Sequence, residues 1–386
     1  MEVLSIISFI SAFLTILYII VVLAFVNGWY KIKYFDPAIP ANPNVDANPN
    51  TTKVSIIVAA RNEENNISRT IDALLAQTYD KQLTEIIFVD DHSTDRTAEI
   101  IRSYAGSGIK LIVLSENKAL NSYKKKAIQT AIGQSSGKLI ITTDADCSMG
   151  PRWLQTIVCF YEKKQHKMIS SPVAFFEEKS FFEKAQSLEF LYLIGLGAST
   201  IGNKKPSTCN GANLAYEKEA FYEVGGFKGI DDLASGDDEL LLHKIAARYS
   251  SNIGFLKNTD AIVYTHAKAT LKEFIQQRKR WASKSTRYKN KSIIILGVCI
   301  WLFNLSILAN IFAGIFILSC LKIAAAQLLT KMLIEFVFLR GVTKFAKRRR
   351  LLTLLPVLNI LHIIYIVYIG IAGNSGKYNW KDRMVK

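Results

Sequence analysis

The chain has 386 residues, of which 50% are hydrophobic, and its formal net charge at pH 7 is +16. Its mean hydropathy is +0.18, whereas a soluble domain of this length usually has a value below zero, which argues against an ordinary soluble protein. The apolar excess lies at the two ends of the chain. This distribution predicts one soluble domain flanked by membrane segments.

The positive charge does not predict a nucleic-acid-binding protein, because no RNA-binding motif or aromatic platform accompanies it. The basic residues lie instead beside the apolar segments, as they do on the cytoplasmic side of membrane proteins. They include Lys31, Lys33, Lys344, Lys347, Arg348, Arg349 and Arg350. The five cysteines are odd in number and form no CxxC pair, so we expect a reducing compartment, with neither a disulfide framework nor a zinc site.

Residues 1–35 are predicted to form an N-terminal transmembrane anchor. Residues 4–26 are apolar and uncharged, and at 1.5 Å per residue such a helix can cross a bilayer. A cleaved signal peptide is disfavoured because Glu2 stands where a basic residue would be expected and no small-residue cleavage site follows. Lys31 and Lys33 follow the apolar run, so the N-terminus is expected outside and the next domain in the cytoplasm.

Residues 36–52 are rich in Pro, Asn and Ala and are interpreted as a linker. They lead into a soluble α/β domain that we expect at residues 53–290. Helical stretches such as 64–77 and 94–104 alternate there with short β-branched runs, which are residues 54–59, 85–90, 110–114 and 138–143. This alternation predicts a Rossmann-like sheet that is largely parallel, with ligands at the carboxyl ends of its strands.

Residues 181–201 form a mixed segment within the soluble part. They combine aromatic and aliphatic residues with Glu183, Lys184 and Glu189. The segment is too polar to span a membrane. It suits either a helix on the bilayer surface or an ordinary buried helix.

Residues 291–386 are predicted to be a C-terminal membrane region with two or three spans. Residues 293–320 and 351–372 are apolar and form the clearer candidates. Residues 321–339 are a weaker candidate because they carry Lys322, Lys331 and Glu335. A span that turns these charges toward a helix bundle is preferred for this segment, and an interfacial helix is the alternative.

The side on which the C-terminus lies depends on how many of these segments cross. The basic run 340–350 is expected inside, which requires both 293–320 and 321–339 to cross. A crossing at 351–372 would then place the tail, residues 374–386, outside, although that tail has four basic residues. If one C-terminal segment is instead re-entrant or interfacial, the charged segment 321–339 is the favoured candidate.

Polar clusters follow the predicted strands of the soluble domain. They are Arg61-Asn-Glu-Glu64, Asp90-Asp91, Asp144-Ala-Asp146 and, after a glycine, Asp237-Asp238. Because strand ends face one edge of an α/β sheet, these carboxylates can converge there. Gathered carboxylates repel one another unless a cation intervenes, and hard oxygen ligands suit Mg²⁺ or Mn²⁺ shared with a diphosphate. The alternative for Asp91 is a cap on a helix that begins near Asp95.

The order of the motifs points to a family. The chain reads VSIIVAARNEE from Val54, VDDHSTDRT from Val89, TDAD from Thr143, GANLAY from Gly211, VGGF from Val224, GDDEL from Gly236 and QRKRW from Gln277. Over about residues 53–281 it resembles the family 2 glycosyltransferases. These are inverting GT-A enzymes, and they include cellulose, chitin, hyaluronan and poly-N-acetylglucosamine synthases and ceramide glucosyltransferases.

The resemblance implies a nucleotide-sugar site, with a UDP-sugar as the expected donor. Ala60 and Glu63 would cradle the base and ribose, and Asp91 would contact the nucleoside with Asp90 beside it. Lys124 lies near a family lysine that meets the donor, although Lys125 and Lys126 blur the register and a solvated basic face is the alternative.

In the Asp-x-Asp motif, the resemblance implies that Asp146 ligates Mg²⁺ or Mn²⁺. Asp144 would help to hold the nucleotide and the metal.

The resemblance also implies a general base and an acceptor motif. Asp238 is the expected base, because the family's Lys and aliphatic residue follow it six positions later as Lys244-Ile245, and Asp237 is the second candidate. Gln277, Arg280 and Trp281 match the family's Gln-x-x-Arg-Trp, in which Arg can pair with the departing diphosphate and Trp offers a flat face to a sugar. A helix that approaches the membrane with a snorkelling Arg and an interfacial Trp is the alternative for this segment.

These observations lead us to expect a multi-pass enzyme of the cell membrane with a cytoplasmic catalytic domain. It would transfer a sugar to a membrane lipid or to a growing cell-envelope polysaccharide. A non-catalytic membrane scaffold that retains the fold is the alternative. Such a scaffold would have lost carboxylates of the site, and each of the expected carboxylates is present.

Overall fold

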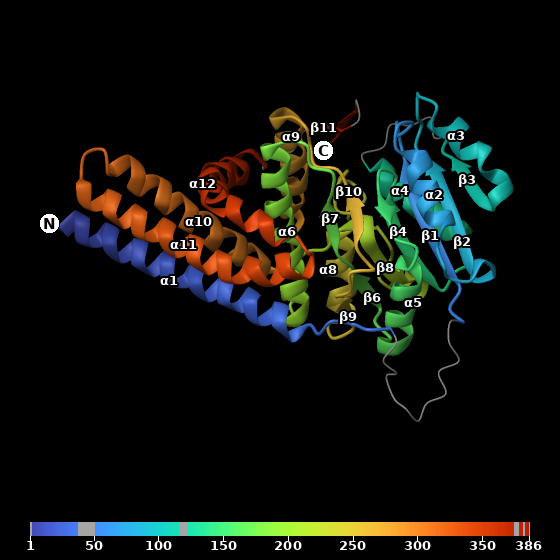
Figure 1. Cartoon of the computed structure of the whole chain (residues 1–386), viewed down its shortest axis with the longest axis horizontal. Coiled ribbons are helices and arrows are strands. Elements are labelled where there is room, and N and C mark those ends of the chain that lie inside the picture. The colour runs from blue at the N-terminus through green and yellow to red at the C-terminus, as the bar shows by residue number, and fades with distance from the viewer. Residues whose placement is uncertain (1, 38–50, 116–121, 374–377, 381–382, 386) are drawn as a thin grey trace. The chain divides into compact units, whose positions relative to one another are not determined.

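The computed structural model describes residues 2–37, 51–115, 122–373, 378–380 and 383–385 (Figure 1). The linker at residues 38–50 and most of the tail beyond residue 373 lie outside the described residues. The chain forms two compact units. The sheet unit comprises Lys31–Glu177, Thr200–Ala267 and Lys377–Lys386, and the helical unit comprises Met1–Tyr30, Glu178–Ser199 and Lys268–Gly376.

The sheet unit is built on a seven-stranded sheet with the order β3-β2-β1-β4-β8-β6-β9. Its first four strands are parallel, and β8 runs antiparallel to both β4 and β6. The strands are β1 Val54–Ala60, β2 Thr84–Asp90, β3 Ile109–Val113, β4 Leu139–Asp144, β6 Met168–Ser170, β8 Leu214–Glu217 and β9 Ile253–Phe255. The predicted Rossmann-like, largely parallel sheet is therefore confirmed.

The interior strand β1 is buried on both faces of the sheet. Its residues Val54, Ile56, Ile57 and Val58 are all buried, which is typical of a parallel strand between two layers of helices. The helices of the sheet unit are α2 Ile67–Leu75, α3 Thr97–Ser103, α4 Tyr123–Gln134, α5 Trp153–Lys164, α7 Lys218–Glu223 and α8 Glu239–Arg248.

Shorter elements complete the description of the chain. A second sheet has the order β5-β10-β7, formed by Ser148–Met149, Val263–Thr265 and Val173–Phe175. A strand pair joins β11 Tyr378–Trp380 to β12 Arg383–Val385. The 3₁₀ turns are η1 Lys81–Leu83, η2 Ala105–Ser107, η3 Gly211–Asn213, η4 Lys284–Arg287 and η5 Arg349–Leu354.

In the helical unit, three helices lie side by side along their length (Figure 1). They are α1 Glu2–Lys31, α10 Lys291–Ala313 and α11 Leu318–Phe345. Tyr18 of α1 stacks on Phe303 of α10 with ring centroids 4.1 Å apart. The Asn310 amide of α10 donates to Gln327 of α11 over 2.9 Å. The unit also contains α6 Phe181–Gly202, α9 Leu271–Ser283 and α12 Leu355–Ala372.

Among the described residues, three helical segments are long and apolar enough to cross a membrane: Glu2–Lys31, Lys291–Ala313 and Arg349–Ala372. The anchor is helical as predicted. The end of the next predicted span, residues 293–320, is wrong. Its helix stops at Ala313, and α11 begins at Leu318 after a turn. A side chain at Gly314 would meet Leu321 at 2.8 Å, which favours glycine in this turn.

The charged segment 321–339 belongs to α11, which packs along the bundle. Lys331 and Glu335 are buried and form an ion pair of 2.6 Å, and Tyr18 donates a hydrogen bond to Glu335. Lys322 is exposed. The prediction that these charges face a bundle is confirmed for two of the three, and the interfacial alternative is not supported by this packing.

Helix α12 runs in a different direction from the other three in Figure 1 but packs against α10, where Trp301 Nε1 donates to the Val367 carbonyl at 3.3 Å. The α10–α11 hairpin brings the start of α10 and the end of α11 to the same end of the bundle (Figure 1). Helix α12 starts directly after α11, and its end at Gly373 packs against Ala282 of α9, the helix that precedes α10. Figure 1 accordingly shows α12 almost end-on, while α1, α10 and α11 extend lengthwise. By length and apolar composition, the predicted span 351–372 is among the candidate membrane spans, whereas residues 321–339 lie in α11, which is not.

Of the two alternatives for residues 181–201, the structure favours the buried helix. Helix α6 buries Leu188, Phe190, Leu191 and Ala198, and its exposed large hydrophobic residue is Phe181 at its first position. A helix lying on a bilayer would instead expose a continuous apolar face.

Candidate nucleotide-sugar site

The predicted site residues begin where three neighbouring strands end. In the sheet register, Ala60 of β1 faces Asp90 of β2, and Ala59 faces Asp144 of β4. Asp90 and Asp144 therefore flank β1 at the same edge of the sheet. The backbone N–H of Asp91 donates to the Ala60 carbonyl over 2.8 Å, which ties the loop after β2 to the end of β1.

The loops after β1 and β2 hold each other in place. Arg61 donates from Nη1 to the carbonyls of Asp91 at 2.9 Å and His92 at 2.6 Å. The Asn62 side chain accepts from the backbone N–H of Thr94 at 2.9 Å. Asn62 and His92 both have positive φ, at 50° and 55°, so the turns are tight and depend on these contacts.

The alternative role of Asp91 as a helix cap is wrong. Helix α3 begins at Thr97, and the carboxylate that accepts its first N–H, over 3.0 Å, belongs to Asp95. Asp91 instead pairs with the His92 ring at 3.0 Å. The hydroxyl of Thr97 also accepts from the N–H of Glu63 at 2.8 Å, so the first-strand motif is fastened to the start of α3.

Asp90 has an oxygen that is available for a ligand. Its side chain is 3% exposed, and Oδ1 has no hydrogen-bond partner among the described residues. Its other oxygen accepts only a long bond of 3.4 Å from the Ser93 N–H. An unsatisfied buried acceptor is costly, and a donor group from a nucleoside would satisfy it. The chemistry of this position therefore fits the predicted nucleoside contact.

The Asp-x-Asp motif is held from behind by α2. The Thr70 hydroxyl lies 2.8 Å from the carbonyls of Ala145 and Cys147, the two residues beside Asp146. Potential ligand atoms of Asp144, Asp146 and Cys147 lie within 4.8 Å of one another.

These donors favour a hard cation. Burial, together with the nearby carboxylates, raises the pKa of the Cys147 thiol well above its usual value, so this group stays protonated. Its Sγ lies 3.7 Å from Asp146 Oδ1 as a hydrogen-bond donor. The carboxylate oxygens of Asp144 and Asp146 remain as the ligands, and they fit Mg²⁺ or Mn²⁺.

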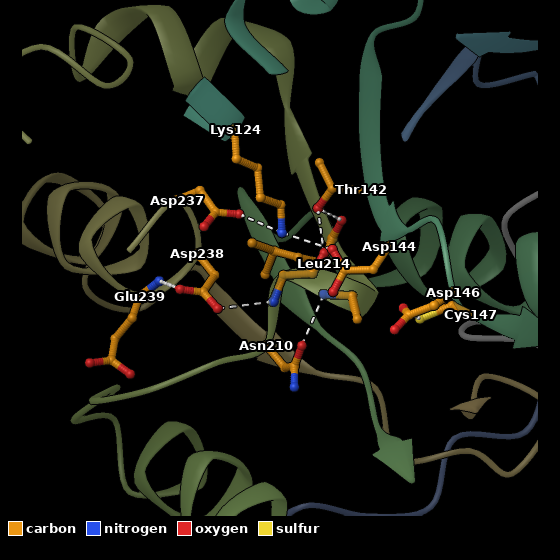
Figure 2. Close-up of polar contacts among 12 residues, drawn as sticks. Lys124, Thr142, Asp144, Asp146, Cys147, Asn210, Leu214, Asp237, Asp238 and Glu239 are labelled. Carbon is orange, nitrogen blue, oxygen red and sulfur yellow. Dashed lines mark hydrogen bonds and ion pairs between the residues drawn. The ribbon is translucent and has the colours of Figure 1, made fainter. Parts of the chain in front are cut away.

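Lys124 joins the Asp-x-Asp motif to the second acidic pair (Figure 2). Its Nζ donates to Asp144 Oδ1 at 2.7 Å and lies 3.1 Å from Asp237 Oδ2. Burial alone would lower the pKa of Lys124, but the carboxylates of Asp144 and Asp237 outweigh burial and raise it. The ammonium is therefore charged, and it lies between two carboxylates that come from different parts of the chain.

The structure separates the three consecutive lysines of α4. Lys125 is 1% exposed, and its Nζ donates to three backbone carbonyls of the loop before the second acidic pair. Those carbonyls belong to Ile230, Leu233 and Ser235, at 2.5, 2.6 and 2.7 Å. Lys126 is exposed. Lys124 is thus the lysine at the site, and a uniformly solvated basic face is excluded.

The second acidic pair lies at the start of α8. Asp238 caps this helix, accepting from the Glu239 N–H at 2.6 Å, and its other oxygen accepts from the Gly211 N–H at 3.1 Å. A side chain at Gly211 would lie 3.2 Å from Asp237 Oδ2, so the GAN motif needs glycine where it approaches the pair. Lys244 donates to the carbonyls of Gly226 and Lys228, which anchors the other end of the same loop.

The remaining predicted residues lie in the helical unit. Gln277, Arg280 and Trp281 share one face of α9, because they are three and four positions apart. The helix begins with a capping box between Thr270 and Glu273. The structure thus gathers the donor-side residues and the acid pair in one unit and carries the Gln-x-x-Arg-Trp motif in the other.

Sequence reasoning missed three residues that hold these motifs. Thr70 and Lys125 fix the loops around the carboxylates, and Arg278 is buried inside the QRKRW motif. Lysine and arginine are seldom fully buried, and nothing in the residues around Lys125 and Arg278 indicates that these two are. Their position inside recognised motifs was the available signal.

A parallel-rich sheet with carboxylates at the ends of β2 and β4, and an Asp-x-Asp at the end of β4, defines the GT-A class of glycosyltransferase domains. Residues 55–225 match Glycosyl transferase family 2. This part of the chain is therefore similar to the glycosyltransferase domains of family 2.

The protein is similar to several known glycosyltransferases. It is 37% identical over 102 residues to glycosyltransferase AglE of Haloferax volcanii, covering 26% of this chain and 33% of that one. It is 25% identical over 238 residues to probable glycosyltransferase YdaM of Bacillus subtilis, covering 60% and 54%. It is 29% identical over 137 residues to a beta-monoglucosyldiacylglycerol synthase of Nostoc sp., covering 35% and 29%. The chain thus spans from about a third to about half of these relatives.

Among solved structures, the chain resembles mannosyltransferase PcManGT from Pyrobaculum calidifontis in complex with GDP-Man and Mn²⁺. The TM-score is 0.56, covering 94% of this chain and 99% of that one, at 18% identity. At this identity the likeness establishes the fold alone.

Proposed function

We propose that this protein is a membrane glycosyltransferase. It transfers a sugar from a nucleotide-sugar donor to a membrane lipid or a growing cell-envelope polysaccharide, with inversion at the anomeric carbon. The observation that carries this proposal is Lys124, which joins Asp144 of the Asp-x-Asp motif to Asp237 of the acid pair. The donor-binding motif and the acid pair that contains the proposed base are thereby kept at one edge of one sheet, as sugar transfer requires.

Donor binding uses the strand-end residues. Asp90 and Asp91 accept hydrogen bonds from the nucleoside, with Ala60 and Glu63 beside it, and Lys124 moves its charge toward the diphosphate. Asp146 and Asp144 hold Mg²⁺ or Mn²⁺, which would neutralise charge on the departing diphosphate. PcManGT, solved with GDP-Man and Mn²⁺, supports this choice of ligand class.

Transfer needs a base on the acceptor side. Asp238 takes the proton of the acceptor hydroxyl as that oxygen attacks the anomeric carbon, and the bond from that carbon to the diphosphate breaks. Asp237 is the second candidate, since its carboxylate is also in the site but is neutralised by Lys124. Arg280 pairs with the leaving diphosphate, and Trp281 stacks on a sugar.

A lipid acceptor is favoured over a polymer. Relatives of this chain include a beta-monoglucosyldiacylglycerol synthase and a glucosyl-dolichyl phosphate glucuronosyltransferase, whose names specify lipid-linked products. The three-helix bundle is also small, which argues against a wide polymer channel in one chain. An elongating polysaccharide synthase is the second candidate, supported by the Gln-x-x-Arg-Trp motif.

The protein lies in the cell membrane with its sheet unit in the cytoplasm. In this proposal helices α1, α10 and α11 cross the bilayer. Helix α12 is embedded without crossing, since it starts directly after α11 and its end packs against Ala282 of α9 and Trp301 of α10. This arrangement returns the tail and its four basic residues to the cytoplasmic side, in agreement with the positive-inside trend.

Purified full-length protein, incubated with radiolabelled UDP- and GDP-sugars, Mn²⁺ and native lipid extract, tests the proposal. We expect one donor to label a product that partitions into the organic phase or stays with detergent micelles. A product of fixed single-sugar mass identifies a lipid acceptor, and a ladder of masses identifies a polymer. Failure of every donor to label any product would contradict the proposal.

A further inference from the structure

A buried ion pair underlies the Gln-x-x-Arg-Trp motif in the helical unit. Arg278 of α9 is 1% exposed, and Glu189 of α6 is 4% exposed. The guanidinium donates from Nε to Glu189 Oε1 at 3.1 Å and from Nη2 to Oε2, so both carboxylate oxygens are engaged. Tyr365 of α12 lies beside this pair and packs against Phe274 of α9, with ring centroids 5.4 Å apart. Three helices thus meet at one charged pair.

The same guanidinium contacts two residues of the motif. Its Nη1 donates to the side-chain oxygen of Gln277 at 2.7 Å. Its central carbon lies 4.2 Å from the centre of the Trp281 ring, and the Phe274 ring lies on the guanidinium at 4.5 Å. Gln277 precedes Arg278 and Trp281 follows it by three positions, so one side chain orients both.

These contacts determine how the motif can meet a ligand. A guanidinium only donates hydrogen bonds, so the Gln277 atom that faces it must be the amide oxygen. The Gln277 NH₂ group is then left to donate to a hydroxyl or phosphate oxygen of a ligand. The Trp281 ring is held by Arg278, and by Phe190 at 6.0 Å between ring centroids, and it remains partly exposed.

Stability alone does not account for this pair. A buried ion pair gains little over apolar residues of the same volume, because removing both charges from water offsets their attraction. Its fixed two-bond geometry is what an apolar substitute would lack.

We propose that Arg278 and Glu189 form a positioning pair that fixes Gln277 and Trp281 for an oxygen-rich acceptor. This inference rests on the proposed function and deepens it. The pair does not touch the reacting atoms. It sets the direction of the Gln277 amide donor and the plane of the Trp281 ring, so its loss should affect use of the acceptor more than use of the donor.

The chain offers a matched control. Arg348 donates from Nη2 to both oxygens of Glu178, each over 2.7 Å, and this second two-bond pair also lies in the helical unit. Glu178 also accepts a hydrogen bond from the Ser187 hydroxyl. Arg348→Gln therefore removes a similar pair elsewhere in the same unit.

The test uses the full-length protein in detergent and compares Arg278→Lys, Glu189→Gln, the double variant Arg278→Gln/Glu189→Gln, and the Arg348→Gln control. The rate of sugar transfer to acceptor and the rate of donor hydrolysis are measured for each, with Tm. We expect the ratio of transfer to hydrolysis to fall by about 10- to 100-fold in the Arg278 and Glu189 variants, since misplacement by about 1 Å can have that effect. The single variants should lower Tm because each leaves one buried charge unpaired, and the double variant should restore Tm without restoring the ratio of transfer to hydrolysis. The Arg348→Gln control should keep the ratio of the unmodified protein.

A ratio unchanged in Arg278→Lys and in the double variant would overturn the positioning role. If unmodified protein transfers no sugar at all, the proposed function fails instead. The positioning claim is then decided by the fluorescence emission of Trp281. This emission is obtained by subtracting the spectrum of the same protein that carries Trp281→Phe. Arg278→Lys should shift the Trp281 emission, and an unshifted emission would again overturn the proposal.

Discussion

A substitution at Asp146 is the most direct test of the proposed metal site. It belongs to a group whose ligand atoms lie within 4.8 Å, and the neighbouring thiol is held protonated. Asp146→Asn removes one carboxylate charge at constant volume. We expect sugar transfer to fall by at least about 10²-fold and Mn²⁺-dependent donor binding to weaken, because the diphosphate charge is then poorly neutralised. Tm should be nearly unchanged.

Calorimetric titration of donor with and without Mn²⁺ checks this prediction. The outcome that would contradict it is full activity of the unmodified protein in excess chelator.

Asp238 and Asp237 are neighbours with different surroundings, so single substitutions can separate their roles. Asp238 accepts from two backbone N–H groups, whereas Asp237 pairs with Lys124. Asp238→Asn keeps a cap for α8 and should stop transfer while leaving nucleotide binding nearly intact. Asp237→Asn should weaken donor binding by releasing Lys124. Measured Kd and kcat for both variants decide the matter, and the reverse pattern would assign the base to Asp237.

At the scale of elements, the loop from Gly226 to Asp238 is held by two buried or half-buried ammonium groups. Lys125 holds its middle and Lys244 its start. Lys125→Met would leave three carbonyls of buried residues without their donor. We expect the free energy of unfolding to fall by about 2–4 kcal/mol. Transfer should also slow, because the loop leads into the acid pair.

The same lysine predicts a pH dependence. Burial lowers the pKa of Lys125 to about 8, so the group is charged at pH 7 and becomes neutral as the pH rises through that value. A neutral amine has two N–H donors for three carbonyls, and transfer should therefore decline above pH 8. The pH profile of kcat/KM between pH 7 and 10 checks this, with Lys125→Met lacking the decline. An identical decline in both proteins would assign it to another group.

The strands were the most predictable elements. The runs at residues 54–59 and 138–143 are buried and β-branched, and they became β1 and β4 with bounds shifted by about one residue. Motif order located the donor side of the site. The partner of Lys124 could not be predicted, since Asp144 and Asp237 are distant in sequence and meet only in the folded sheet unit.

The apolar helices were less predictable because hydropathy does not report the direction in which a helix runs relative to its neighbours. Residues 321–339 looked weak on account of their charges, yet Lys331 and Glu335 neutralise each other inside the bundle. Residues 351–372 are apolar enough to span a membrane, and the end of α12 packs against Ala282 of α9 and Trp301 of α10. Composition measures affinity for hydrocarbon, whereas packing against α9, α10 and α11 sets the path of α12.

At the scale of the whole molecule, this path of α12 can be tested in cells. In a cysteine-free background, single cysteines at Arg349 and Ser375 report on the ends that flank α12. We expect a membrane-impermeant maleimide to label neither in intact cells and both after permeabilisation, because both ends face the cytoplasm. A cysteine near the N-terminus, at Val3, should react from outside. Labelling of Ser375→Cys in intact cells would restore α12 as a crossing helix.

The central claim is that one carboxylate site on the sheet transfers sugar to an acceptor held by the membrane. Its most direct test is single-turnover transfer from a labelled nucleotide-sugar in native membranes that contain the unmodified protein or Asp238→Asn at equal abundance. We predict label in the lipid fraction with the unmodified protein and at least about 10²-fold less with Asp238→Asn, while both bind the nucleotide equally. Equal incorporation by the two proteins, or label found only in water-soluble products, would contradict the account.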